Sequence, residues 1–394
     1  MSTRYVLGLG GTVDYEIAWT PDVLDRLVAE HAITPDELDV HVPIGSERDL
    51  LRTLLAFVRD GVGGERFVAS SDIVAAFAGH FPVRVTLGGT CVRAAIAMDV
   101  LGLASTVHLV SIDDHVRRLL PASTSYLCSA ESDSLDPHLI VQFPAGTTIR
   151  VGSDEVVAPH PNRIIYVNDP PNRELLLHPG LPDAMADADV VLVSGFNVIQ
   201  DAETLEHRLA DVRKGLQRLA PGALAYFEDA GYHVPALARR VRDELSGLVD
   251  VYAMNEDELQ SWLGRTVDLL DADDVAAALV ELASVVPAPT RVVHTKHWAL
   301  AHGGDAERYR APLLGGITMA GTRYVHGDGF TPDDYAATGT TTPQPEGVAF
   351  AAALESVLPS AVCVPAFALD TAAPTTIGLG DTFVGGFLAA AGRA

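Results

Sequence analysis

A glycine turn followed by an acidic residue, near the end of the sequence, is the strongest indication of chemistry. Gly378-Leu379-Gly380-Asp381 leads into an apolar, alanine-rich run that predicts a helix. The first N–H groups of a helix have no helical carbonyl to pair with, so they can bind an anion such as a phosphoryl group in transfer. The carboxylate of Asp381 could then accept the proton of an attacking hydroxyl. The alternative from spacing alone is an ordinary glycine turn with Asp381 as a helix cap.

A pair of oxygen ligands follows a predicted buried strand. Asn255 and Glu258 come directly after the strand predicted over 249–253. Residues three apart at a helix start share one face, so the amide and the carboxylate can converge. Such ligands hold Mg²⁺ through its waters and leave room for phosphates. Asn255 and Glu258 alone also fit an ordinary capping pair, but together with the glycine turn downstream they favour a magnesium site.

Other residues are placed where a substrate could bind. Asp14 follows the first predicted strand, and a carboxylate at that end of a strand in an α/β sheet is well placed for a ligand. Gly88-Gly89 joins a strand to a helix and lets the backbone approach a ligand closely. Arg163 carries a fork of donors suited to phosphate. The alternative for Asp14 is a solvated loop residue, and for Arg163 a surface salt bridge.

Several of these segments resemble one enzyme family. The stretch Gly378–Phe383 is similar to the GxGD signature of the ribokinase superfamily. With Thr376 and Ile377 in front it resembles the TVGLGDT form of the ADP-dependent glucokinase and phosphofructokinase family. Asn255–Glu258 matches the superfamily's NxxE, and Asn162–Ile165 is close to the family's NRFI. The matches follow one another in the family's order along nearly the whole chain.

The resemblance implies roles for residues that spacing alone does not assign. It implies that Asp14 and Glu65, with the Gly88-Gly89 turn, hold the sugar. It implies that Arg163 holds a phosphate of the nucleotide, together with the N–H groups at Gly378 and Gly380. Asp381 is then the general base, the backbone of Gly378, Leu379 and Gly380 stabilises the moving phosphoryl group, and Glu228, Asn255 and Glu258 surround Mg²⁺.

The sequence departs from the family at four positions. Gly10 and Thr12 stand where asparagines are usual, and Thr90 replaces the amide of the GGN or GGQ turn. Tyr226 replaces the histidine of an HxE segment whose glutamate is kept as Glu228. The changes at Gly10, Thr12 and Thr90 indicate an acceptor pocket that has drifted from the family's usual one.

The alternation of strands and helices predicts an α/β fold with a large, mostly parallel sheet flanked by helices. The family resemblance makes it ribokinase-like, with a smaller β-rich lid. We expect 1–12, 84–135 and 185–394 to form the large nucleotide-binding domain, and 13–83 and 136–184 to form the sugar-binding lid. Segment 308–316 is expected to be irregular and 327–345 to be a long loop. His294 and Lys296 could line a nucleotide groove, but we expect them to lie in a surface hairpin.

Composition limits the possible functions. With 27 basic and 52 acidic residues the net charge is -25, which argues against nucleic acid as a partner. Three widely spaced cysteines argue against a disulfide scaffold or a structural zinc site. No apolar run is long enough to span a bilayer, and no GxxxxGK[ST] loop of a P-loop kinase is present. We therefore expect a cytoplasmic protein, either a monomer or a small homo-oligomer.

Motifs and resemblance together predict a Mg²⁺-dependent enzyme that transfers a phosphoryl group from ADP to a sugar hydroxyl. Glu65 favours glucose as the acceptor, with fructose 6-phosphate next. Nothing in the spacing separates ADP from ATP, so an ATP-dependent carbohydrate or nucleoside kinase of the same superfamily is one alternative. A sugar- or nucleotide-binding relative without catalysis is the other.

Overall fold

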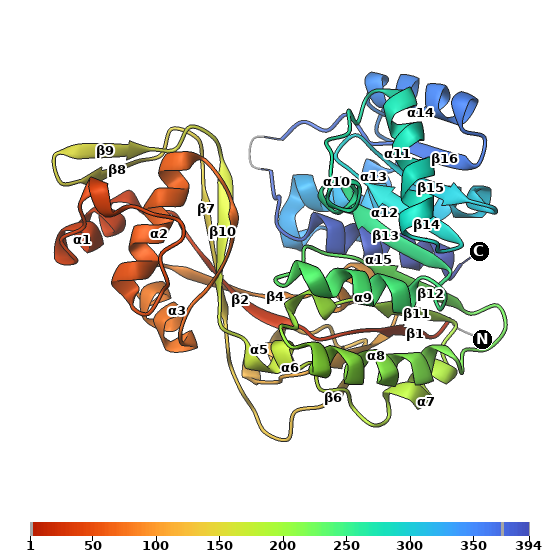
Figure 1. Cartoon of the computed structure of the whole chain (residues 1–394), viewed down its shortest axis with the longest axis horizontal. Coiled ribbons are helices and arrows are strands. Elements are labelled where there is room, and N and C mark those ends of the chain that lie inside the picture. The colour runs from red at the N-terminus through yellow and green to blue at the C-terminus, as the bar shows by residue number, and fades with distance from the viewer. Residues whose placement is uncertain (1–2, 372–373, 394) are drawn as a thin grey trace.

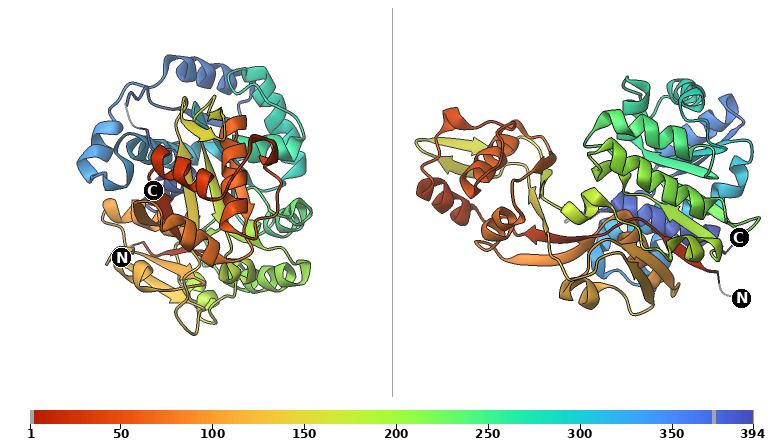
Figure 2. Two further views of the ribbon diagram at one scale, coloured as in Figure 1. Left: turned by 90° about the vertical axis from the view of Figure 1, so that its left-hand side faces the viewer. Right: turned by 60° about the horizontal axis from the view of Figure 1, so that its bottom comes forward.

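The computed structural model describes residues 3–371 and 374–393 and shows two parts of unequal size (Figure 1). The larger part contains a nine-stranded sheet, and the smaller part contains a five-stranded sheet. Figure 2 shows the smaller part standing out from the larger one on extended strands. The predicted fold class, a large mostly parallel sheet with a smaller β-rich lid, is confirmed.

The nine-stranded sheet is parallel except where β15 and β16 join its edge. Its order is β16-β15-β14-β13-β12-β11-β1-β5-β6. Strands such as Val190–Val193 are buried along their whole length because helices cover both faces, as is usual for parallel sheets. The strands are β1 (Tyr5–Leu7), β5 (Ser105–Leu109), β6 (Thr124–Cys128), β11 (Val190–Val193), β12 (Leu224–Glu228), β13 (Val251–Asn255), β14 (Thr290–His294), β15 (Trp298–Gly303) and β16 (Ala361–Pro365).

Each face of this sheet has its own hydrophobic core. One core contains the helices α7 (Leu181–Ala186), α8 (Ala202–Leu216), α9 (Pro235–Leu245), α10 (Glu256–Leu263), α11 (Ala272–Val285) and α14 (Pro345–Val357). The other contains α4 (Thr90–Val100), α5 (Asp114–Leu119), α12 (Arg310–His326) and α15 (Leu379–Ala391). The predicted catalytic turn begins α15 and therefore lies on the second face. The short helices α6 (Pro170–Glu174) and α13 (Pro332–Thr338) complete the large part.

Two expectations from the sequence are wrong. Segment 308–316 is not irregular, because α12 begins at Arg310, and segment 327–345 is not one long loop, because it contains α13. Glycines hide α12 in the sequence, yet they are what lets it pack closely against α15: a Cβ on Gly315 would lie 2.7 Å from the Gly386 carbonyl oxygen. Within 3–371 and 374–393, no helix combines the length and the apolar character needed to cross a membrane.

The smaller part is the lid. Its sheet has the order β3-β10-β7-β2-β4. Its strands are β2 (Thr12–Ile17), β3 (Gly64–Phe67), β4 (Val83–Gly88), β7 (His138–Phe143) and β10 (Asn162–Val167). Helices α1 (Pro21–Glu30), α2 (Glu47–Asp60) and α3 (Ser71–Ala78) pack on one face, and the hairpin β8 (Thr148–Val151) and β9 (Asp154–Val157) closes that core. In the part of the chain that the structure describes, no helix of the lid packs on the opposite face of this sheet.

The boundary expected between residues 83 and 84 falls inside β4. All six residues of β4, from Val83 to Gly88, pair with β2, so this strand belongs to the lid sheet over its full length. The physical reason is register: β2 and β4 stay paired from Ile17 and Val83 in the lid to Thr12 and Gly88, directly before the helix α4 of the large part. The wider division of the chain into two domains stays a prediction.

Candidate active site

The turn predicted to be catalytic has the geometry that its glycines favour. Gly378 caps α15 with a φ of 65°, a left-handed conformation that favours glycine. Asp381 lies in the first turn of the helix and is not its cap, so the capping alternative is wrong. One carboxylate oxygen, Oδ1, accepts a hydrogen bond of 2.8 Å from the hydroxyl of Thr90. The side chain of Asp381 is 27% exposed, so it remains reachable by a ligand.

Thr90 joins two glycine turns that lie far apart in the sequence. Gly89 caps α4 with a φ of 85°, and Thr90 is the first residue of that helix. The hydroxyl at this position, which replaces the family's amide, orients Asp381. The Gly88-Gly89 turn and the Gly378–Asp381 turn therefore face one another across a single hydrogen bond.

A buried arginine that the sequence analysis did not single out completes this cluster. Arg93 is 5% exposed and donates from Nη2 to Oδ2 of Asp14 at 2.9 Å. Its Nε lies 3.9 Å from Oδ2 of Asp381. Thr12 donates to the other oxygen of Asp14 at 2.7 Å. The signal for Arg93 in the sequence was its place in the first turn of the helix after Gly88-Gly89, where a charged residue interrupts an apolar run.

Three predicted site residues, two for the sugar and one for the nucleotide, share one face of the lid sheet. Asp14 pairs with His138, and the strand register places Arg163 and Glu65 on the same side, since side chains alternate along a strand. This is the face opposite α1, α2 and α3, whose core takes the alternate residues. We call it the open face. The structure thus places Asp14, Glu65 and Arg163 on one surface. Their separate roles toward sugar and nucleotide stay predictions.

Two histidines on or beside the open face were not predicted. His138 Nε2 lies 3.0 Å from Asp169 Oδ2. Burial lowers the pKa of His138, but Asp169, with Asp14 and Glu65, raises it more, so the net shift is upward. His233 of the large part lies 3.0 Å from Glu65 Oε1, an ion-pair distance without the alignment of a hydrogen bond. Its ring also meets Phe67 edge-on, so this contact joins the lid to the large part.

The side chain of Arg163 lies apart from the catalytic turn. It is exposed, and within the described residues its side chain makes no ion pair or hydrogen bond, although its N–H bonds to Asn162 Oδ1 at 2.9 Å. The structure therefore brings together Asp381, Thr90, Arg93 and Asp14, and leaves Arg163 on the lid. Its phosphate role stays a prediction.

The predicted metal residues lie at the carboxyl ends of β12 and β13. Glu228 accepts from Tyr226 at 3.0 Å and lies 2.8 Å from His294 Nε2, which is buried. Residues 294–298 do form a turn between antiparallel strands, but His294 points into the site and not to the surface. His294 also stacks on Phe383 of α15, which connects Glu228 to the catalytic helix.

Asn255 and Glu258 form a full capping box. Asn255 Oδ1 accepts from the N–H groups of Asp257 at 2.7 Å and Glu258 at 3.1 Å, and Glu258 Oε2 accepts from the Asn255 N–H at 2.8 Å. The capping alternative is therefore present, and it leaves Oε1 of Glu258 available. Within the described ranges, no three acidic, histidine or cysteine side chains are arranged to hold a metal directly.

The charges around Glu258 nevertheless fit a cation. Burial raises the pKa of Glu258 to about 8, and Glu228 and Asp229 add to that rise. Burial also raises the pKa of Asp229 to about 6, although Trp262 and Tyr252 donate to its carboxylate. Buried carboxylates that repel one another gain when a cation lies between or beside them. This donor set fits a hard, hydrated divalent ion.

Two pockets border these residues. One, of about 700 Å³, lies between α9 and α10 and is lined by Asp229, Tyr232, Arg239, Arg242, Glu258 and Trp262. The other, of about 260 Å³, lies where β4 meets α12 and α15, and its polar lining is Arg84, Thr86, Arg93, Arg323, Asp328 and Thr382. The second pocket adjoins Asp381 through its neighbour Thr382.

Residues 3–305 match the family model for the ADP-specific phosphofructokinase/glucokinase conserved region. The chain belongs to this family. The family resemblance expected from the sequence is thus confirmed. The turn at 378–381 lies beyond the matched range, so it is an observation independent of the match. A comparison with curated proteins finds no match.

Solved structures of the family share the fold of the whole chain. A hypothetical ADP-dependent phosphofructokinase from Pyrococcus horikoshii OT3 is 16% identical, covers 100% of this chain and 98% of its own, and superposes with a TM-score of 0.78. A phosphofructokinase from the same organism with AMP is 16% identical over 100% and 98%, with a TM-score of 0.79. An ADP-dependent kinase in complex with fructose 6-phosphate and ADPβS is 15% identical over 99% and 94%, with a TM-score of 0.71. At these identities the likeness establishes the fold of this family of sugar kinases.

Proposed function

We propose that this enzyme transfers the β-phosphoryl group of ADP to a hydroxyl of a hexose, with Asp381 as the general base. The observation that carries the proposal is the position of Asp381: first turn of α15, oriented by Thr90, and partly open to ligand. A carboxylate held beside free helix N–H groups can take a proton at the place where phosphoryl charge is stabilised.

The proposed transfer is a single displacement at the β-phosphorus of ADP. The acceptor hydroxyl gives its proton to Asp381 as its oxygen bonds to the β-phosphorus. The bond from that phosphorus to the bridging oxygen breaks, and AMP leaves with the electron pair. Thr90 keeps one oxygen of Asp381 oriented, while the N–H groups of Leu379 and Gly380 face the anion. Closure of the lid over the acceptor would exclude water.

Mg²⁺ is proposed as the cofactor, held through its waters by Glu228 and Glu258 with Asn255 nearby. When bound it would neutralise phosphate charge. Two changes test the site: Glu258→Gln keeps the shape of the side chain and removes its charge, and Glu228→Gln does the same beside His294. We expect each to weaken Mg²⁺ about 10- to 100-fold, measured by the rise in melting temperature on adding Mg²⁺ without nucleotide. An unchanged Mg²⁺ titration for both would remove these ligands from the proposal.

Glucose is the first acceptor to test. Asp14 and Glu65 on the open face can accept bonds from sugar hydroxyls, and the two histidines near them lie beside carboxylates: His138 beside Asp169 and His233 beside Glu65. Fructose 6-phosphate is the second candidate, because an ADP-dependent kinase of the same fold is solved in complex with it. Arg163, exposed on the open face, is proposed to contact a phosphate of the nucleotide.

Product formation decides among these possibilities. The wild type and Asp381→Ala are incubated with Mg²⁺, ADP or ATP, and glucose, fructose 6-phosphate or a nucleoside. AMP and a phosphorylated sugar formed by the wild type alone would support the proposal and identify the acceptor. Turnover only with ATP would move the chain to the ATP-dependent alternative. Binding of ADP without turnover on any acceptor would favour a non-catalytic binding protein.

A further inference from the structure

Arg93 is a buried cation beside the proposed catalytic base. Its side chain lies directly on the catalytic turn: a Cβ on Gly378 would be 2.6 Å from Arg93 Cδ and 3.0 Å from its Nε. The guanidinium therefore lies between the carboxylate of Asp14, 2.9 Å from Nη2, and that of Asp381, 3.9 Å from Nε. No other arginine among the described residues pairs with Asp381.

Most N–H groups of Arg93 make no hydrogen bond to the described residues. A guanidinium has five N–H donors, and within the described residues Arg93 donates one hydrogen bond, to Asp14. Burial lowers the pKa of Arg93, but Asp14, Asp381 and Asp328 raise it more, so the group is charged. Arg93 also lines the 260 Å³ pocket beside Thr382, where a ligand could meet these donors.

Its neighbour Arg323 shows what a structural arginine looks like at the same turn. Arg323 donates from Nε to the carbonyl oxygen of Ile377 at 2.9 Å and pairs with Asp328, which also pairs with Arg84. Those bonds hold the backbone that leads into Gly378. Arg93 makes no bond to this backbone among the described residues, so holding the turn is the work of Arg323.

We propose that Arg93 is a catalytic residue that contacts the phosphoryl group during its transfer; this rests on the proposed function. The phosphorus–oxygen bond to AMP breaks while the bond to the acceptor forms, and the acceptor proton goes to Asp381. Arg93 keeps its own protons and donates hydrogen bonds to the oxygens of the phosphoryl group. A fork of charged donors fits the geometry of these oxygens. Arg93 also offsets the charge of Asp381, which would otherwise repel the incoming anion.

A merely structural role predicts a different result, and kinetics separates the two. If Arg93 contacts the phosphoryl group, Arg93→Gln should lower kcat about 100- to 1,000-fold, as loss of a transition-state donor does. If it only positions Asp14, the KM for the sugar should rise while kcat stays within a few-fold, as in Asp14→Asn. Arg93→Lys keeps the charge without the fork and should lie between wild type and Arg93→Gln. Guanidinium ion added to Arg93→Gly should restore part of kcat.

Binding of inorganic phosphate gives a test without turnover. Titration calorimetry on the whole protein should show phosphate binding to the wild type and at least about tenfold weaker binding to Arg93→Gln. Arg291→Gln is the matched control, because Arg291 is also buried but donates to the carbonyls of Ala288 and His302. Melting temperatures of all variants establish that they are folded.

The outcomes distinguish this inference from the proposed function. AMP formation by the wild type with an undiminished kcat in Arg93→Gln would overturn the role of Arg93 and leave the proposed function standing. Phosphate binding that depends on Arg93, in a wild type that turns over no sugar, would support the site and overturn the proposed function. No phosphate binding to the wild type, or equal binding by Arg93→Gln, would overturn the inference.

Discussion

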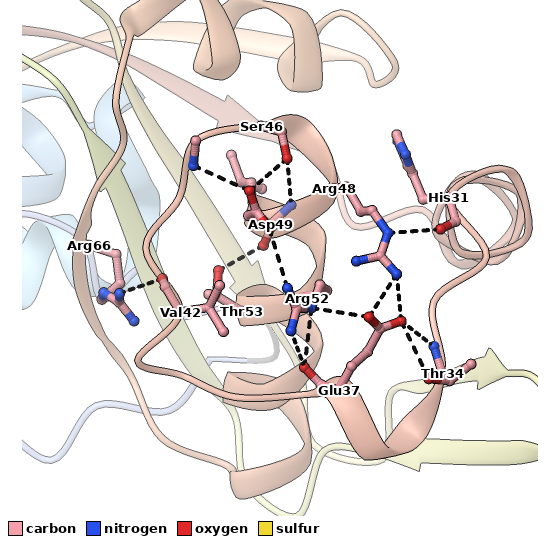
Figure 3. Close-up of polar contacts among 12 residues, drawn as sticks. His31, Thr34, Glu37, Val42, Ser46, Arg48, Asp49, Arg52, Thr53 and Arg66 are labelled. Carbon is pink, nitrogen blue, oxygen red and sulfur yellow. Dashed lines mark hydrogen bonds and ion pairs between the residues drawn. The ribbon is translucent and has the colours of Figure 1, made fainter.

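Two clusters of arginines and carboxylates in this molecule have the same ingredients and different surroundings. In the lid, Arg48 and Arg52 converge on Glu37 (Figure 3). Both oxygens of Glu37 accept from Arg48, at 2.8 and 2.7 Å, while Arg48 Nε donates to the His31 carbonyl at 3.1 Å. In the active site, Arg93 lies between Asp14 and Asp381.

The difference lies in the donors that remain. The lid arginines use theirs on carbonyls as well as carboxylates: Arg52 bonds to the Glu37 carbonyl at 3.2 and 3.0 Å. These bonds tie the 3₁₀ turn Pro35–Glu37 to α2 and fix the path of the chain. Arg93 is more deeply buried, bonds to one carboxylate and borders a pocket. The two clusters contain the same kinds of residue. What distinguishes the ligand site from the structural ion cluster is that N–H donors beside a cavity have no bonding partner among the described residues.

The largest effect should come from Asp381→Asn, which breaks the active-site cluster at its base. We expect kcat to fall about 100- to 10,000-fold, because the acceptor proton loses its carboxylate. The melting temperature should stay close to that of the wild type, since the side chain is partly exposed and its shape is kept. Measured by AMP release, a variant that keeps more than a tenth of wild-type turnover would contradict the base assignment.

Thr90→Val tests orientation in the same cluster. It removes the 2.8 Å hydrogen bond to Asp381 Oδ1, and we expect kcat to fall about tenfold, in line with the loss of one hydrogen bond. The matched control is Thr53→Val in the lid, which removes a buried bond of 2.9 Å to the Tyr166 hydroxyl. That control should lower stability and leave kcat unchanged. Equal kcat losses in both variants would mean that Thr90 acts through folding and not through Asp381.

The lid cluster should respond in stability alone. Glu37→Gln and Arg48→Gln should each lower the free energy of unfolding by about 1 kcal/mol, a modest value because the pair is partly solvated. Denaturant titration of the two single variants and the double variant gives the coupling between them. A change in kcat of more than a few-fold in either variant would show that the lid cluster is not purely structural.

The smallest effect is a pH dependence of that stability difference. Burial raises the pKa of Glu37, but Thr34, Arg48 and Arg52 lower it more, so the folded pKa lies below the unfolded one. The stabilisation is therefore present above the unfolded pKa of about 4.3 and is lost as pH falls through the folded value. The gap in unfolding free energy between wild type and Glu37→Gln should narrow below about pH 4. A gap that widens in acid would reverse the sign.

Much of the fold and part of the site could be predicted, because local rules dictate them. Buried strands such as Val190–Val193 are continuous apolar runs, and Ser46 caps α2 as its side chain suggests. The turn at Gly378 has the backbone that glycine allows. Helix α12 was missed because Gly315 and Gly316 lower helix propensity, and their benefit appears only when Gly386 lies opposite Gly315 and Phe383 opposite Gly316.

The site residues that escaped prediction depend on contacts across long separations. Arg93 meets Asp14 and Asp381, which lie 79 residues before it and far beyond it in the sequence. His294, at the end of β14, reaches Glu228 at the end of β12 across the intervening β13, and the hairpin pattern of the sequence does not indicate this contact. The acceptor preference for glucose, the phosphate role of Arg163 and the magnesium ligands remain predictions, because each depends on a ligand and not on the fold.

The strands β2 and β4 give the lid a mechanical connection to the chemistry. β2 carries Asp14 near one end, β4 runs into the Gly88-Gly89 turn, and Thr90 follows at once. The same pair continues outward as part of the lid sheet. A movement of the lid therefore also moves β2 and β4, which position Asp381 and Arg93. We expect that Asp381 is not aligned for proton transfer when ADP binds without an acceptor. Hydrolysis of ADP should therefore stay slow until a sugar binds and the lid closes.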